Sequence, residues 1–441
     1  MNARKELRHH RVPEGAVENL AAGHGGPEAI EWLVAFQYSR HVLLVRGVVG
    51  QASREGRADA SRIRAAFDLL ADVQREHPGV VDDVLRHPAV GAWALAALTG
   101  QADPGALAGV AAAAAVRAGV PGTIDVPVED GLLMLPSVGG AALPASARTA
   151  EVRIGRGVEV VAEGTRVVLP ADPHADAPGW QGLRRLTAGQ ARPLRLLLDD
   201  LDPYRLPGNV VRGRLGDAEA ARWRQALHDA WLLLCRHHAA TAAEIGAMIR
   251  VLTPLPAGDP GLRSATHPGV FGCTALSDPV DGLMLASTLA HEVQHTKLAA
   301  LMSAVPLVRQ DDTRTFYAPW RDDPRPLGGL LQGSYAYLGV SGFWRRQRHH
   351  EQGEAAVAAH AEFARWRDAA LEATGTLLGS GGLTRQGETF AERMRRTLLA
   401  WRDDRVPDAA VSLARSSAER HRMHWRRHHG DQNRPGAPGT P

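Results

Sequence analysis

Apolar residues recur at helical spacing along most of the chain, so the sequence predicts a mainly α-helical protein. The first 118 residues contain only patterns of this kind, and the last of them is rich in alanine. Pro13 is placed to begin a short first helix, and Pro88 interrupts a longer helical pattern. The longer helices expected here are residues 28–51, 60–76, 80–100 and 107–118.

After Gly119 apolar and polar residues alternate, and this change of period predicts β-strands. Residues 123–135 and 151–169 both alternate in this way, with turns expected at residues 129–131 and at Gly164. The two hairpins together predict a small antiparallel sheet. The carboxylates of the first turn lack the spacing of a calcium loop. Further strands are expected at residues 249–252 and 270–276, and a strand followed by a turn at residues 196–206.

Helical patterns return in the second half of the chain, where the expected helices are residues 217–238, 239–248, 285–305, 327–344, 354–378, 387–403 and 408–425. The expected fold class is therefore α+β, predominantly α-helical, with a small antiparallel sheet. Its expected regions are a helical region of residues 1–118, a mixed region of residues 119–280, a helical region of residues 281–426 and a disordered tail of residues 427–441.

Charge and composition narrow the range of partners. Lys and Arg (51) nearly balance Asp and Glu (48), so no general nucleic-acid-binding surface is expected. The chain has no run of eighteen apolar residues and no apolar segment near its start, so neither a membrane span nor a signal peptide is expected. Its two cysteines, Cys235 and Cys273, fit a reducing compartment, and we expect a cytoplasmic protein.

The most informative motif is His291-Glu292-Val293-Gln294-His295, at the centre of the expected helix 285–305. His291 and His295 are four residues apart, so their imidazoles point the same way and can bind one metal ion. Glu292 lies about 100° round the helix from His291, within reach of a metal-bound water or of a neighbouring polar group. A chance pair is the alternative in a chain with 20 histidines. The apolar flanks favour the metal site, because buried imidazoles need partners.

The residue type of the third metal ligand would distinguish a zinc peptidase from an Fe(II) enzyme. Leu301 occupies the position of the third histidine of metzincins, and the expected helix 327–344 contains no Glu, Asp or His. Its first coordinating side chain is Gln332. The aspartates of the preceding loop are alternatives: Asp311, Asp312, Asp322 and Asp323. The missing carboxylate disfavours a zinc peptidase and favours Fe(II), which needs open positions for a co-substrate and O₂.

Two other segments are candidates for binding a metal ion or a substrate. Asp199, Asp200 and Asp202 form an acidic cluster, which we interpret as solvated or helix-capping rather than metal-binding. In metallopeptidases with the HExxH motif, an edge strand upstream of the metal helix pairs with extended peptide. Residues 270–275 are the candidate for such an edge, with Val270, Phe271 and Gly272 as substrate contacts. An ordinary sheet strand is the alternative.

Three stretches, HEVQHTKL (291–298), YAPWRDDPRPLGGLLQG (317–333) and YAYLGVSGFW (335–344), resemble the HExxH family of peptide-modification proteins found in gene clusters for ribosomally made peptide natural products. LRHPAVGAW (85–93) extends the resemblance toward the N-terminus. Members of that family are regarded as iron- and 2-oxoglutarate-dependent peptide β-hydroxylases. They often act beside radical-SAM enzymes that form cyclophane rings.

The resemblance implies a zincin-like core in which His291, His295 and Gln332 hold Fe(II), with 2-oxoglutarate and O₂ as co-substrates. Glu292 then has a positioning or proton-handling role instead of that of a peptidase base. The implied enzyme is a dioxygenase that hydroxylates a precursor peptide, including one that a radical-SAM enzyme has already cross-linked.

Bound 2-oxoglutarate would also need a cation for its distal carboxylate. Arg321 and Arg325 are the candidates, and pairing with Asp322 or Asp323 on the surface is their alternative role. Tyr317 and Tyr335 are further candidate co-substrate contacts. Three hypotheses therefore remain: the oxygenase, a peptidase that uses Zn²⁺, and a metal-free peptide-binding protein.

Overall fold

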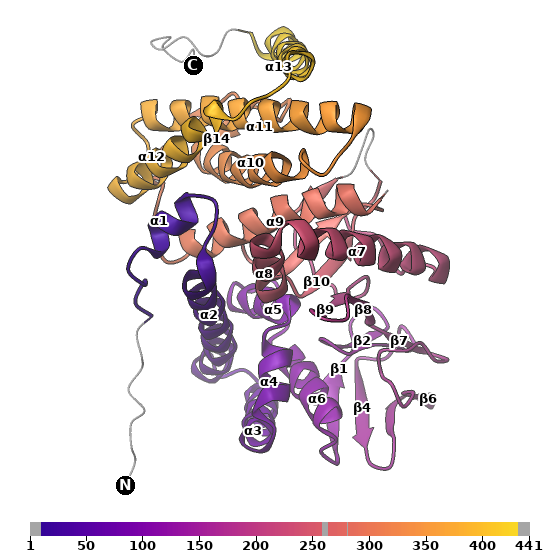
Figure 1. Ribbon diagram of the computed structural model, residues 1–441. Coiled ribbons are helices and arrows are strands. Elements are labelled where there is room, and N and C mark those ends of the chain that lie inside the picture. Colours follow the sequence, from indigo (N-terminus) through magenta and orange to yellow (C-terminus); the bar gives the residue numbers. More distant parts are fainter. Residues whose placement is uncertain (1–9, 258–262, 280, 431–441) are drawn as a thin grey trace. The chain divides into compact units, whose positions relative to one another are not determined.

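The computed structural model describes residues 10–257, 263–279 and 281–430 (Figure 1). Helices make up 55% of it and the sheets are small and mostly antiparallel, so the expected α+β class is confirmed. The chain divides into two compact units. Unit 1 comprises Met1–Leu33, Leu232–Ala247 and Leu283–Pro441, and unit 2 comprises Val34–Trp231 and Met248–Gly282. Each unit is assembled from separated stretches, whereas the four expected regions were continuous.

The helices of unit 2 follow the predicted pattern closely. Two of them begin and end at the predicted residues, and the predicted break at Pro88 separates two short helices that each begin with proline. The helices that lie wholly in this unit are α3 (Ala60–Glu76), α4 (Pro78–Leu85), α5 (Pro88–Leu98) and α6 (Leu107–Ala118). Unit 2 also includes most of α2 (Gly26–Arg54) and α7 (Asp217–His237).

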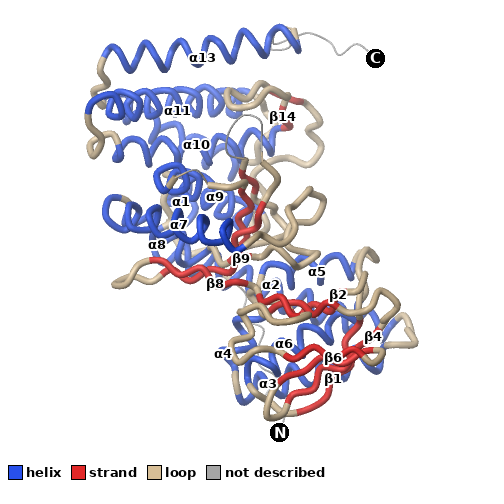
Figure 2. Tube along the Cα trace, turned by 90° about the vertical axis from the view of Figure 1, so that its right-hand side faces the viewer, coloured by secondary structure: helices blue, strands red, loops and turns tan. Residues whose placement is uncertain are grey.

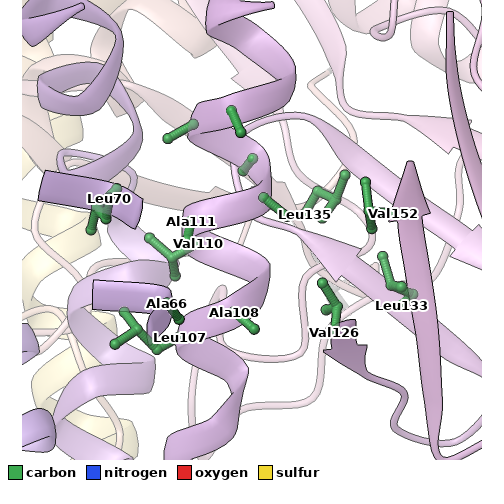
Figure 3. Packing of buried hydrophobic residues seen from close by; sticks show 14 of the residues in the cluster. Ala66, Leu70, Leu107, Ala108, Val110, Ala111, Val126, Leu133, Leu135 and Val152 are labelled. Carbon is green, nitrogen blue, oxygen red and sulfur yellow. The ribbon is translucent and has the colours of Figure 1, made fainter. Parts of the chain in front are cut away.

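Helix α6 packs on two antiparallel sheets of unit 2. One has the order β1-β4-β5-β6, with β1 (Gly122–Pro127), β4 (Thr149–Ile154), β5 (Val158–Ala162) and β6 (Thr165–Val168). The other has the order β2-β3-β7, with β2 (Leu132–Leu135), β3 (Gly139–Ala142) and β7 (Trp180–Gly182). The alanine-rich α6 covers both, because its small side chains permit close approach. A Cβ on Gly109 would lie 2.7 Å from the carbonyl oxygen of Met134. Figure 3 shows Val110 and Ala111 of α6 on one side of this core and Leu135 and Val152 of the strands on the other.

The prediction of one sheet from two hairpins was wrong. The turn at residues 129–131 forms, with Asp130 and Gly131 both at positive φ. The hairpin that it closes is only one residue pair long, the bridge between Glu129 and Leu132. Beyond that bridge the two strands separate, because β1 pairs with β4 and β2 pairs with β3. The predicted turn at Gly164 is confirmed between β5 and β6.

The third sheet of unit 2 contains the strand that was expected to pair with an extended peptide substrate. Its order is β11-β12-β10-β9-β8, with β8 (Arg184–Ala188), β9 (Leu194–Leu198), β10 (Val251–Pro254), β11 (Ser264–Ala265) and β12 (Cys273–Leu276). β12 is buried, runs parallel to β10 and is covered on its other side by β11. Val270, Phe271 and Gly272 form the turn before β12. These three residues therefore lie outside the strand. On the side away from β10, β12 pairs with β11 only at Ala275 and Leu276.

The described part of unit 1 is mainly helical and includes one short hairpin. Its helices include α1 (Ala16–Ala21), α9 (Gly282–Met302), α10 (Leu327–Gln347), α11 (Gly353–Gly379), α12 (Arg385–Ala400) and α13 (Asp408–His429). It also contains most of α8 (Ala239–Met248) and the hairpin of β13 (Thr315–Phe316) with β14 (Arg325–Pro326). Figures 1 and 2 show α11 between α10 and α13.

The last helix extends beyond the predicted end at residue 425. α13 continues through residues 427–429 of the expected disordered tail, because no helix-breaking residue occurs before Gly430, which has positive φ. Residues 431–441 of that tail lie outside the described part of the chain. None of the described helices is long and apolar enough to cross a membrane.

Candidate metal centre

Helix α9 carries the HExxH motif and packs closely on α10 in unit 1. Gln294 lies against Gly339, where a Cβ would be 2.4 Å from Cγ of the glutamine. Lys297 of α9 is fully buried and donates to Glu244 of α8 at 2.7 Å. Burial lowers the pKa of Lys297, and the carboxylate of Glu244 opposes this shift. These contacts fix the position and rotation of α9.

The two motif imidazoles converge as the sequence predicted. Nε2 of His291 lies 3.1 Å from Nε2 of His295. Two imidazole nitrogens that each lie about 2.0–2.1 Å from one ion, at angles of roughly 90–110°, are about 2.8–3.4 Å apart. The observed separation therefore fits two ligands of one ion. Burial lowers the pKa of His291 to about 4, so this ring is neutral and has a lone pair to offer at physiological pH.

Glu292 lies beside the same nitrogen. Its side chain is 1% exposed, and Oε1 is 3.8 Å from Nε2 of His291. The carboxylate is thus close enough to interact with a water or substrate group bound in front of the imidazole pair.

Gln332 contacts His295 on the other side of the ring. Its Oε1 lies 3.1 Å from Nδ1 of His295, and its Nε2 donates to Sδ of Met302 at 3.6 Å. An amide oxygen can only accept, so Nδ1 of His295 carries the proton and Nε2 keeps its lone pair. In this arrangement Gln332 orients His295, as hydrogen-bond acceptors do for metal-binding histidines.

The four loop aspartates do not complete the site. Within the described ranges, no Asp, Glu, Cys or further His joins His291 and His295 in a group whose ligand atoms lie within 4.8 Å of one another. Asp312 pairs with Arg314, and Asp323 pairs with two other arginines. Within these ranges the two imidazoles therefore have no third ligand of these residue types.

An aromatic wall adjoins His291. The ring of Tyr337 lies 5.1 Å from that of His291. It is stacked on Trp320 at 4.7 Å and tilted by 32° against Trp366 at 4.3 Å. Trp320 reaches α10 because Gly333 has no side chain, since a Cβ there would lie 2.5 Å from the indole. We did not single out these aromatic residues from the sequence, although Trp320 and Tyr337 both lie in the stretches that carry the family resemblance.

The two tyrosines expected to contact the co-substrate lie elsewhere. Tyr335 is fully buried and donates its hydroxyl hydrogen to the carbonyl of Leu20 at 2.7 Å. Tyr317 is buried against α13, with its hydroxyl 3.0 Å from Nδ1 of His421. Residues 335 and 337 are about 200° apart on a helix, so only one of the two tyrosines of α10 can face His291.

Arg321 and Arg325 both bind Asp323, at 2.6 Å and 3.2 Å. This is the surface pairing considered as their alternative role. The charge of Arg321 also influences Tyr337 of the aromatic wall. Burial raises the pKa of Tyr337, and the positive charges of Arg365 and Arg321 oppose that rise. These two guanidinium groups therefore lie within electrostatic reach of the ring that contacts His291.

A second set of possible metal ligands lies in unit 2. His87, Asp199 and Asp202 bring ligand atoms within 4.8 Å of one another, and all three side chains are buried. The interpretation of this acidic cluster as solvated was wrong, since Asp200 is also buried, beside Arg184 and Arg214. Apolar flanks such as Leu196 and Leu198 were the available sequence signal for burial. This group could hold a metal ion.

Comparison of the chain with protein-family models and with curated proteins finds no match.

Proposed function

We propose that this protein is an Fe(II)- and 2-oxoglutarate-dependent oxygenase that hydroxylates a peptide at a β-carbon. The observation that carries the proposal is the convergent pair His291 and His295, with no third His, Cys or carboxylate atom within 4.8 Å of both imidazoles in the described part of the chain. A closed zinc site needs more protein ligands than this. A pair with open positions suits an iron ion that must also take a chelating co-substrate and O₂.

Each residue of the site has a role in this proposal. His291 and His295 would hold the ion, and Gln332 would fix the ring orientation of His295 through its bond to Nδ1. Glu292 would orient a water molecule or exchange a proton in front of His291. A zincin-like core is the corresponding fold assignment, with α9 as its metal-binding helix.

Iron with 2-oxoglutarate supplies the oxidising chemistry: one atom of O₂ enters the peptide, the other enters succinate, and CO₂ is released. The chain must bind the distal carboxylate of 2-oxoglutarate. Arg321 and Arg325 are the candidates, and each would first have to leave Asp323. The aromatic wall would exclude water from the reacting carbon.

A ribosomally made precursor peptide is the proposed substrate, on the strength of the sequence resemblance. The stacked rings of Trp320, Tyr337 and Trp366 support a peptide with apolar or aromatic side chains, including a cyclophane cross-linked one. Rings of this kind bury area at low conformational cost.

A zinc-dependent peptidase is the second candidate, and Glu292 favours it. Its carboxylate lies 3.8 Å from Nε2 of His291, where the general base of an HExxH peptidase would act. The lack of a third His or carboxylate ligand among the described residues disfavours a zinc peptidase.

The deciding experiment incubates the protein with Fe(II), 2-oxoglutarate, O₂ and the precursor peptide. We expect the peptide to gain about 16 Da, the mass of one oxygen atom, with formation of succinate. The His295→Ala variant should give neither product. Peptide fragments formed with Zn²⁺ and without 2-oxoglutarate would refute the oxygenase and support the peptidase.

A further inference from the structure

Three buried polar side chains of unit 2 come together from distant parts of the chain. His87 immediately precedes α5, while Asp199 and Asp202 lie in the turn that follows β9. Their exposed fractions are 3%, 0% and 2%. Nε2 of His87 is 3.7 Å from Oδ2 of Asp199, and one ligand atom from each residue lies within 4.8 Å of the other two.

Several polar atoms of this group lack hydrogen-bond partners. Both ring nitrogens of His87 and Oδ2 of Asp199 are buried and unpartnered. The other oxygen of Asp199 accepts from the backbone N–H groups of residues 201 and 202, so the turn itself fixes the carboxylate with Oδ2 near His87. Buried polar atoms without partners are costly and uncommon in folded proteins. A metal ion that binds one ring nitrogen of His87 and Oδ2 of Asp199 would remove part of this cost.

The charge of the group is also unbalanced. Across the described ranges, neither carboxylate forms an ion pair with Lys or Arg. Arg205 lies near, but its terminal nitrogens donate to the backbone carbonyls of Asp202 and Arg212. Asp200 provides the contrast, because two arginines neutralise it.

A further unpartnered imidazole lies one helical turn away. Nε2 of His41 is buried without a partner, while its Nδ1 lies 2.9 Å from the carbonyl oxygen of Leu85. The ring occupies space that a side chain on Gly91 would fill, since a Cβ there would be 2.3 Å from Nε2 of His41. Gly91 lies in the first turn of α5, and His87 is the residue before that helix.

We propose that His87, Asp199 and Asp202 bind a divalent first-row metal ion, independently of the HExxH pair. One imidazole and two carboxylates suit Zn²⁺, Mn²⁺ or Fe²⁺ better than Ca²⁺ or Mg²⁺, which prefer oxygen ligands alone. A dication balances the two carboxylates. The ion is shielded from solvent and joins the start of α5 to the end of β9, so its role is structural.

The test uses the full-length chain with the first site removed. The His291→Ala/His295→Ala variant, dialysed against Zn²⁺ or Mn²⁺ and washed with a weak chelator, should retain one metal ion per chain by mass spectrometry. Addition of Asp199→Asn and Asp202→Asn should abolish that ion, whereas Asp125→Asn, at an exposed site in β1, should leave it unchanged. Metal absent from the first variant, or retained after both Asn substitutions, overturns the proposal.

Thermal unfolding supplies a second readout. The direction in which Asp202→Asn changes the melting temperature shows whether the two carboxylates bind a metal ion. Asn preserves the turn hydrogen bonds and removes charge. Without a metal site, Asp202→Asn relieves repulsion, so the variant should be at least as stable as the wild type under all conditions, which would refute the proposal. With a metal site, strong chelator should lower the melting temperature of the wild type by roughly 5–10 °C. The Asp202→Asn variant should then melt below the metal-loaded wild type and should not respond to chelator.

Discussion

The close contact of α9 with α10 gives a sharp prediction for Gly339→Ala. The new Cβ would lie 2.4–2.7 Å from three atoms of the Gln294 side chain, about 1 Å inside ordinary contact. Gln294 is buried, and its amide donates to the carbonyl of Gly23 at 3.2 Å. Relief of the clash therefore requires movement of this side chain or of α10.

Overpacking of this kind costs about 1–3 kcal/mol, and loss of the Gln294 hydrogen bond costs about 1 kcal/mol more. The higher helix propensity of alanine offsets up to about 1 kcal/mol. We expect a net loss of about 1–3 kcal/mol in the free energy of unfolding, measured by urea denaturation. Movement of α10 should also weaken metal binding, on the order of tenfold, because it shifts Gln332 away from His295.

Two variants test whether the stated contact is the cause. Gly375→Ala, in α11, places its Cβ in open space and should stabilise the protein by roughly 0.5–1 kcal/mol. Gln294→Ala removes the atoms that clash, so Gly339→Ala should cost at least about 1 kcal/mol less in that background. If Gly339→Ala proves as harmless as Gly375→Ala, or if Gln294→Ala gives no rescue, the inferred packing of α9 on α10 is incorrect.

Three further predictions follow from the same unit. Gln332→Ala should weaken Fe(II) binding about 10–100-fold through loss of the His295 Nδ1 contact, and an unchanged dissociation constant would exclude this role. Arg321→Ala should raise the 2-oxoglutarate concentration for half-maximal turnover about tenfold with iron content intact; no change would remove Arg321 as a co-substrate ligand. Burial lowers the pKa of His238 to about 4, so its neutral form stabilises the fold above the unfolded pKa of about 6.5, and up to about 3 kcal/mol is lost as pH falls toward 4. Urea unfolding of wild type and His238→Asn across this range should diverge at low pH, and parallel curves would contradict the assignment.

Local sequence signals predicted the parts of the fold that depend on local physics. Helical periodicity and proline positions located most helices, and spacing alone predicted that His291 and His295 converge. Helix geometry could not decide between Tyr335 and Tyr337, because that choice depends on how α10 is rotated against α9. Contacts such as that of Gln294 with Gly339 set the rotation, and they join residues far apart in the chain.

The order of the strands and the burial of the aspartates could not be predicted from the sequence for a related reason. An apolar strand such as residues 273–276 has the same pattern at an edge as at the centre of a sheet, so its two neighbours could not be anticipated. Asp199 and Asp202 had the composition of a solvated turn. Their burial follows from the approach of His87 across more than a hundred residues of chain, which no local pattern encodes.

The most direct measurement for the HExxH pair needs no knowledge of the peptide. Anaerobic protein loaded with Fe(II) should develop a visible charge-transfer absorption band when 2-oxoglutarate is added, because the keto acid chelates iron through the open positions of the site. The band should be absent from His291→Ala and His295→Ala and should persist in Asp202→Asn, which lies in the other unit. A wild-type protein that binds Fe(II) at His291 and His295 but gives no band with 2-oxoglutarate would contradict the oxygenase assignment.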